Sequence, residues 1–261
     1  MKATKISTYI LACIMLISCS EMIEFSPFDT EVKSSNLNNF YTESLNSSYL
    51  AANDTLSFVL LSDSHYYYDK LNKAVSSINN QKNIAFVAMV GDLTDSGLTR
   101  EYEYYWKRMR KLKFPVITVI GNHDCLSNGY TTYTRMFGEP NFSFVCGNYK
   151  FIAFNSVVWE NGNKCPDFNW LKNEIEVSDQ KCVILTHIPP WGDQFTDEMS
   201  EKYYEIANLP EVILNAHGHE HRHQDTLING KRYIVNEALF DNEYYIIHMA
   251  GDNVRVEIVR F

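Results

Sequence analysis

Short apolar runs alternate with longer amphipathic stretches from about Thr55 onward. The apolar runs are typical of buried strands and cover residues 56–61, 84–90, 116–120, 150–154, 183–185 and 212–214. The stretches between them place apolar residues three or four positions apart, as amphipathic helices do, most clearly at residues 69–81, 99–112 and 167–177. Strands separated by helices predict an α/β layered core.

The last part of the chain has a different pattern. Residues 232–235, 244–249 and 254–259 are short strand-like runs, and the last two are joined by a turn that contains Gly251-Asp252-Asn253. This pattern predicts an antiparallel meander. An α/β layer completed by antiparallel strands is compatible with two stacked mixed sheets between helices.

The start of the chain has the features of an export signal. Lys2 and Lys5 precede a mostly apolar run, residues 6–17, which is too short to span a bilayer comfortably. The sequence Leu16-Ile17-Ser18-Cys19 resembles a bacterial lipobox, which implies cleavage before Cys19 and lipid anchoring of that cysteine to a membrane surface. A plain secretory signal, or an apolar helix at the start of the chain, is the alternative.

A polar segment separates this signal from the alternating pattern. Residues 20–54 are rich in Ser, Asn, Thr and acidic residues with only scattered apolar positions, which is typical of a tether or loosely packed leader. We therefore expect an exported, lipid-anchored protein with three parts, namely a signal peptide (1–18), a tether or N-terminal leader (19–54) and one domain (55–261).

Composition narrows the class of protein. The chain has 261 residues, of which 45% are hydrophobic and 21% charged, as in an ordinary folded domain. Its formal net charge of −9 gives an acidic surface that repels long polyanions, so no nucleic-acid partner is expected.

Four cysteines remain beyond the leader: Cys125, Cys146, Cys165 and Cys182. An even number permits disulfides in an export compartment without showing that any forms. Cys182 lies in an apolar run and is expected in a buried strand. Metal binding by cysteine is not expected, because no CxxC spacing occurs.

Five polar clusters follow apolar runs at the points where the predicted strands end. They are Asp63-Ser64-His65, Gly91-Asp92-Leu93-Thr94-Asp95, Gly121-Asn122-His123-Asp124, His187, and Gly218-His219-Glu220-His221. In open α/β sheets, ligands bind in the crevice outside the carboxyl ends of the strands. We therefore expect the five clusters to converge on one site.

The residue types in these clusters are those of a metal centre. Asp63 and His65 stand two positions apart at a strand end and project to the same side, and His219 and His221 repeat that spacing. Mixed imidazole, carboxylate and amide ligands suit manganese, iron or zinc rather than calcium. Two metal ions are needed to use all of them.

The order DxH, GDxxD, GNHD, H and GHxH resembles the calcineurin-like metallophosphoesterase family. The matching span runs from Asp63 to His221, nearly the whole predicted domain. The resemblance implies a four-layer α/β/β/α sandwich of two mixed sheets. It also implies roles for individual residues: Asp63, His65, Asp92 and His221 hold the first metal, Asp92 bridges, Asn122, His187 and His219 complete the second, and His123 is the general acid with Asp95 as a supporting carboxylate.

The same resemblance implies a reaction. A hydroxide that bridges the two metals attacks phosphorus, and His123 protonates the leaving oxygen. We expect a small phosphoester substrate, in the first place a phosphodiester. A nucleotidase-like phosphomonoesterase or a pyrophosphohydrolase is the alternative within the class. A surface lipoprotein that binds metal and a ligand without turnover is the alternative from another class. The sequence makes no prediction about the oligomeric state.

Overall fold

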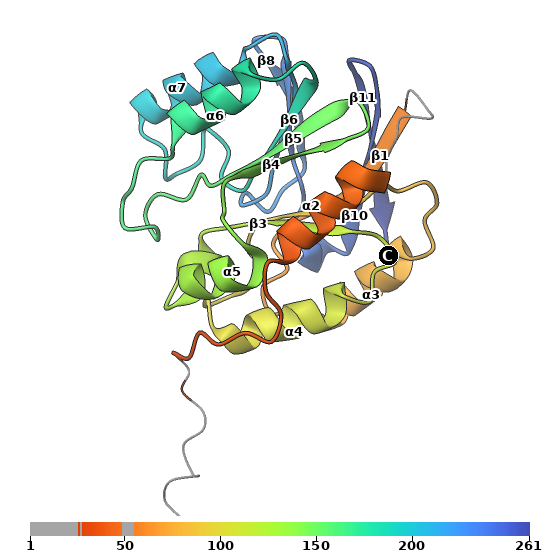
Figure 1. The fold of residues 1–261 in the computed structure, drawn as a ribbon, viewed down its shortest axis with the longest axis vertical. Coiled ribbons are helices and arrows are strands. Elements are labelled where there is room, and N and C mark those ends of the chain that lie inside the picture. The colour runs from red at the N-terminus through yellow and green to blue at the C-terminus, as the bar shows by residue number, and fades with distance from the viewer. Residues whose placement is uncertain (1–25, 27, 49–54) are drawn as a thin grey trace, which may run out of the picture.

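The computed structural model describes residues 26, 28–48 and 55–261, and in it two mixed β-sheets pack face to face (Figure 1). The first sheet has the strand order β11 (Asn253–Arg260), β10 (Glu243–Ala250), β1 (Thr55–Leu61), β2 (Val87–Val90), β3 (Val116–Val119). The second has the order β4 (Phe142–Cys146), β5 (Tyr149–Phe154), β6 (Lys181–Thr186), β7 (Val212–His217), β9 (Lys231–Val235), β8 (Gln224–Ile228). In the first sheet β1, β2 and β3 are parallel and the antiparallel hairpin β10–β11 completes one edge, whereas in the second sheet antiparallel strands complete both edges of a parallel middle.

Helices cover the outer face of each sheet (Figure 1). The first sheet is covered by α3 (Tyr68–Ile78), α4 (Thr99–Met109) and α5 (Gly129–Phe137), and the second by α6 (Phe168–Glu176) and α7 (Asp197–Ala207). Two short 3₁₀ helices, η1 (His123–Cys125) and η2 (Leu239–Asp241), lie in the loops. The expected four-layer α/β/β/α sandwich is confirmed.

The central strands are apolar on both faces because both faces are buried. In β1, Val59 and Leu61 pack in the core beneath the helices, whereas Phe58 and Leu60 pack in the core between the sheets. Phe58 meets Phe151 of the second sheet edge to face, with ring centroids 5.4 Å apart. Burial on two faces explains why these strands appear in the sequence as continuous apolar runs and not as alternating ones.

The C-terminal strands are arranged differently from the expected meander. β10 and β11 form the expected antiparallel hairpin, but β9 lies in the other sheet and pairs in parallel with β7. The prediction of one meander was therefore wrong for residues 232–235. Tyr233 and Ile234 are both fully buried, one under the helices and one between the sheets, and burial on both faces favours an interior parallel position.

Part of the N-terminal leader packs on the domain. Residues of this segment form α2 (Leu37–Ser48), in which buried Asn38 bonds to Thr118 of β3 through its amide nitrogen and its amide oxygen, at 2.9 Å each. Leu45 is buried in the core between the sheets. The expectation of a loosely packed leader is corrected for α2, because these contacts attach it to β3 and to the core between the sheets.

The signal peptide and Cys19 lie outside the described residues. Among the helices that the structure describes, none combines the length and hydropathy needed to cross a membrane. The four cysteines in the described part of the chain are unpaired, and Cys182 is buried on β6 as expected.

Candidate metal centre

The predicted site residues follow the carboxyl ends of five parallel strands. Hydrogen bonds between main-chain atoms connect the loops: Asp63 N–H donates to Gly91, His65 N–H donates to Asp92, and Gly218 N–H donates to His187. These contacts bring the ends of β1, β2, β6 and β7 to one edge of the two sheets. The expected convergence of the clusters is thus present.

Five of the predicted metal ligands have a left-handed backbone conformation. Their φ angles are positive: Asp63 55°, His65 40°, Asp92 52°, His219 71° and His221 49°. Such angles are uncommon for residues other than glycine and persist only where the surrounding structure enforces them. Their concentration here indicates that the fold holds these side chains for a function.

The first ligand group consists of Asp63, His65 and His221, whose donor atoms lie within 4.8 Å of one another. Nε2 of His221 is 3.1 Å from Oδ1 of Asp63. His65 is buried, and neither of its ring nitrogens has a hydrogen-bond partner. Burial lowers the pKa of His65 and so favours the neutral ring, which offers a lone pair. A buried, unpartnered imidazole beside a carboxylate fits a cation.

The second ligand group consists of Asp92, His187 and His219, again with donor atoms within 4.8 Å. Oδ1 of Asn122 joins them, 3.2 Å from Nε2 of His187 and 3.1 Å from Nδ1 of His219. Ligand atoms about 2.1 Å from one tetrahedral ion lie about 3.4 Å apart. The spacing of this group therefore fits one metal ion.

His187 is oriented for binding by the main chain. Its Nδ1 donates to the carbonyl oxygen of Val90 at 2.8 Å, which leaves Nε2 to face Asp92 at 3.2 Å. Burial would lower the pKa of His187, but Asp92 and Asp63 outweigh it and raise the pKa to about 10. The negative field that holds this proton is the field that the site offers to a cation.

One oxygen of Asp92 lies between the two groups. Its Oδ2 is 3.2 Å from Nε2 of His187 and 3.8 Å from Nε2 of His65. Its other oxygen, Oδ1, accepts a hydrogen bond from the main-chain N–H of His123 at 2.9 Å. Asp92 thus has the place of a bridging carboxylate, and the residues present fit two ions.

Asp95 contacts His123 through its main chain. Nδ1 of His123 lies 2.6 Å from the carbonyl oxygen of Asp95, whereas the carboxylate of Asp95 lies 3.6 Å from Nδ1 of His65. The contact with His123 that was expected from the Asp95 carboxylate is made by the carbonyl oxygen of the same residue. The Asp95 carboxylate forms a third cluster with His65 and His123, whose candidate ligand atoms lie within 4.8 Å of one another.

Gly91 leaves the space that His187 occupies. Its φ is +91°, and a Cβ at this position would stand 2.3 Å from Nδ1 of His187. We expect Gly91→Ala to lower the free energy of unfolding of the metal-free protein by about 3 kcal/mol, as overpacking does, and to weaken binding of the second ion. Chemical denaturation and metal titration measure the two effects.

Gly162 provides the control for that substitution. Its φ is +72°, but nothing lies within 4 Å of a Cβ built there. Gly162→Ala therefore carries the backbone strain without the steric clash. Equal losses of stability in the two variants would show that contact with His187 is unimportant.

Asp124 is a structural residue that the sequence interpretation left outside the site. Its buried carboxylate accepts hydrogen bonds from the main-chain N–H groups of Leu93, Thr94 and Gly121 and from the hydroxyl of Thr94, at 2.9 to 3.1 Å. It thereby joins the loop that carries Asp92 to the loop that carries Asn122. Burial and the neighbouring Asp92 raise the pKa of Asp124 to about 7.

Asp124→Asn is expected to destabilise the protein by about 2–3 kcal/mol at pH 8.5, where the native carboxylate is ionised. An amide has one accepting oxygen, so at least one buried donor loses its partner. Thermal or urea unfolding measures the loss. Thr94→Val, which removes a single donor, is the control, and a loss in Asp124→Asn no larger than in this control would contradict the joining role.

Two acidic residues that the sequence did not single out border the second group. Oδ1 of Asp193 lies 3.1 Å from Nε2 of His219, and Oε1 of Glu160 lies 3.4 Å from Nδ2 of Asn122. Both stand in loops and carry no local signal of a site. Only the fold brings them to the ligands.

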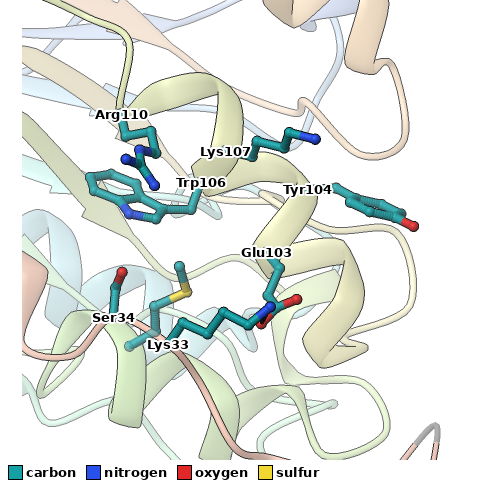
Figure 2. Close-up of a pocket in the computed structure, with 8 residues that line it drawn as sticks. Lys33, Ser34, Glu103, Tyr104, Trp106, Lys107 and Arg110 are labelled. Carbon is teal, nitrogen blue, oxygen red and sulfur yellow. Dashed lines mark ion pairs between the residues drawn. The ribbon is translucent and has the colours of Figure 1, made fainter. Parts of the chain in front are cut away.

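A separate cavity of about 380 Å³ lies among α4, α5 and the segment before α2 (Figure 2). It is lined by Lys33, Ser34, Glu103, Tyr104, Trp106, Lys107, Arg110 and Met136. Lys33 pairs with Glu103 across it at 3.6 Å. None of the predicted site residues lines this cavity.

A family model described as calcineurin-like phosphoesterase matches residues 56–223, the span that contains both ligand groups. The chain belongs to this family. A calcineurin-like phosphoesterase uses a dinuclear metal centre, and the two ligand groups of this chain are arranged to hold its two ions.

Two individual relatives share 27% sequence identity with about half of the chain. Serine/threonine-protein phosphatase CPPED1 of Homo sapiens is 27% identical over 150 residues, 48% of this chain and 47% of that protein. A 3',5'-cyclic-nucleotide phosphodiesterase of Nostoc sp. is 27% identical over 145 residues, 51% of this chain and 54% of that protein. This calcineurin-like phosphoesterase therefore spans about half the length of these curated relatives.

Solved structures share the fold. A dimetal phosphatase from Danio rerio aligns with a TM-score of 0.58 at 13% identity, over 79% of this chain and 99% of that one. A purple acid phosphatase from yellow lupin (Lupinus luteus) aligns with a TM-score of 0.63 at 11% identity, over 81% and 52% of the two chains. At these identities the likeness concerns the architecture alone.

Proposed function

We propose that this protein is a dinuclear metal-dependent phosphoester hydrolase that prefers small phosphodiesters. The observation that carries the proposal is the position of Asp92, with Oδ2 facing both ligand groups and Oδ1 bonded to the main chain of His123. One carboxylate thus links the predicted metal centre to the predicted acid. When bound, two ions supply a water of lowered pKa and a clamp for the phosphoryl oxygens.

His123 is placed to hold and deliver a proton. Its Nδ1 lies 2.6 Å from the carbonyl oxygen of Asp95, and its ring stands edge to face on His65 with centroids 4.7 Å apart. With Nδ1–H donating to that carbonyl, the proton available to a leaving group is the one on Nε2 of the imidazolium. An alkoxide needs such a proton because it is a poor leaving group.

The acidic border of the site favours a diester. The carboxylates of Asp95, Glu160 and Asp193 stand beside residues that would hold the ions. A phosphodiester carries a single negative charge, whereas a monoester carries about 1.5 to 2 near neutral pH. At equal metal charge, the additional carboxylates repel the monoester more strongly. The name of the Nostoc relative, a cyclic-nucleotide phosphodiesterase, supports the same substrate class.

The test is hydrolysis of bis(p-nitrophenyl) phosphate and p-nitrophenyl phosphate by the protein comprising residues 20–261. The protein is first stripped of metal with a chelator and then supplied with manganese, iron or zinc. We expect no turnover without metal, recovery on addition, and a higher kcat/KM for the diester. A higher kcat/KM for the monoester would favour the nucleotidase-like alternative.

If the metal-loaded protein cleaves neither chromogenic ester, its hydrolysis of natural phosphoesters is measured next. These include cyclic nucleotides, glycerophosphodiesters and pyrophosphates. Failure on all of them would overturn the proposed hydrolase. The alternative of a surface lipoprotein that binds without turnover would then replace it.

We propose further that the protein is exported and lipid-anchored through Cys19. The support is the apolar run of residues 6–17 followed by the lipobox-like sequence that ends at Cys19. In bacteria that express the full chain, Cys19→Ala is expected to move the protein out of the membrane fraction, whereas Cys13→Ala leaves it there. Release of the unaltered protein as a soluble species would instead indicate a plain secretory signal.

A further inference from the structure

The loops that follow β5 and β6 are joined by one buried side chain. Gln194 is 3% exposed, and its Oε1 accepts hydrogen bonds from the main-chain N–H groups of Val158 and Trp159 at 2.9 and 3.0 Å. Its Nε2 donates to Oε2 of Glu160 at 2.7 Å. The position of the Glu160 carboxylate therefore depends on Gln194.

The joined loops reach two ligands of the second metal group. The other oxygen of Glu160 accepts from Nδ2 of Asn122 at 3.4 Å. Asp193, the neighbour of Gln194, places Oδ1 3.1 Å from Nε2 of His219. Each of these two ligands has a second polar atom that does not contact the carboxylate, namely Oδ1 of Asn122 and Nδ1 of His219. These two atoms are 3.1 Å apart and lie on the side of the second ligand group. Each carboxylate thus holds a ligand so that its metal-binding atom is presented.

Two other ligands have contacts that do not involve Glu160, Asp193 or Gln194. His187 is oriented by the carbonyl oxygen of Val90. Oδ2 of Asp63, in the first group, accepts from the main-chain N–H of His219. Neither contact involves the side chain of Glu160, Asp193 or Gln194.

We propose that Asp193, Gln194 and Glu160 are positioning residues that set the affinity of the second ion, the one held by Asn122, His187 and His219, and leave the affinity of the first ion unchanged. A carboxylate that accepts the free N–H of an imidazole fixes the tautomer and makes the other nitrogen a better ligand. A carboxylate that accepts from the amide nitrogen of asparagine directs the amide oxygen toward the metal. The proposal rests on the dinuclear centre of the proposed function, but it concerns metal affinity and not the reaction.

Titration of the metal-free protein with Zn²⁺ or Mn²⁺ in a calorimeter tests it, because the two ions are counted separately from turnover. Asp193→Ala and Glu160→Gln are each expected to weaken the second ion by about 10–100-fold and to leave the first unchanged. The side chain of Asp193 is 62% exposed, so its removal should leave the fold intact. Asp179→Ala, an exposed aspartate before the amino end of β6, is the control and should alter neither affinity.

A reciprocal substitution tests the hydrogen-bond chain itself. Glu160→Gln leaves one accepting oxygen for two donors, the amides of Asn122 and Gln194. In the double variant Glu160→Gln/Gln194→Glu, the amide introduced at 160 keeps an oxygen for Asn122 and donates to the carboxylate introduced at 194. That carboxylate still accepts from Val158 and Trp159, so every contact is restored with the same net charge.

The double variant is therefore expected to regain most of the lost affinity for the second ion. Equal weakening of both ions in the single variants, no weakening of either, or no recovery in the double variant would each overturn the proposal. Two ions bound without hydrolysis of any ester would overturn the proposed function and leave the positioning role standing.

Discussion

Asp92→Asn is expected to abolish binding of both ions and to lower kcat/KM at least about 1,000-fold, which corresponds to about 4 kcal/mol of transition-state stabilisation. The reason is that both oxygens of Asp92 are in use: Oδ2 faces both ligand groups, and Oδ1 accepts from the main-chain N–H of His123. An amide can satisfy only one of these contacts with oxygen, and it carries no charge. Elemental analysis of the metal-loaded variant and kinetics with a phosphodiester measure the two losses.

Asp252→Asn is a suitable control for that substitution. Asp252 is exposed and pairs with Lys181 on the surface, and such pairs contribute little to stability. Metal content and activity should equal those of the unaltered protein. Retention of one tightly bound ion by Asp92→Asn would contradict the bridging position, because a bridging ligand serves both ions.

His123→Gln is expected to keep both ions and to slow the reaction by about 100- to 10,000-fold for esters of ordinary alcohols. Its side chain is in neither the Asp63 group nor the Asp92 group, although it forms a third cluster with His65 and Asp95, and its main-chain contact with Asp92 is unaffected by the change. Glutamine cannot donate a proton to the leaving oxygen as an imidazolium does. The loss should be much smaller for p-nitrophenyl esters, whose leaving group needs little protonation.

The measurement is a comparison of kcat across phosphodiesters whose leaving groups differ in pKa. The dependence on leaving-group pKa should be steeper for His123→Gln than for the unaltered protein. His248→Gln is the control, since His248 lies on β10 and bonds to Ser57 and Glu257. An equal loss for all leaving groups, or loss of metal, would assign His123 a role in binding the ions.

The candidate metal ligands could be recognised in the sequence because each follows the end of a strand. The apolar runs identified β1, β2, β3, β6 and β7, and every metal ligand follows one of them within a few residues. Parallel strands in a sandwich bring their carboxyl ends to one edge, so local pattern was sufficient to predict convergence. The contact between His123 and the main chain of Asp95 could not be predicted in this way, because a pattern of side chains does not indicate which main-chain carbonyl groups accept hydrogen bonds.

The position of α2 could not be predicted in the same way. Its segment is polar and has few apolar residues, and its attachment comes from Asn38, which bonds to Thr118 eighty positions later. β9 was recognised as a strand but assigned to the wrong sheet. The pattern of apolar residues in a strand indicates that the strand is buried. Which strand it pairs with depends on packing against residues that are distant in the chain.

The sequence by itself determined the family, the layered fold and the residues that can hold two ions, because these depend on local periodicity and on short motifs at strand ends. Only the tertiary structure decided that Asp124 joins two of the loops, that Asp193 and Glu160 contact His219 and Asn122, and that Gln194 bonds to Glu160. The contacts of Glu160, Gln194 and Asp193 span 26 to 38 positions of the chain and are hydrogen bonds between loops. Such contacts leave no periodic signal, since each depends on where the folded sheets place the ends of their strands.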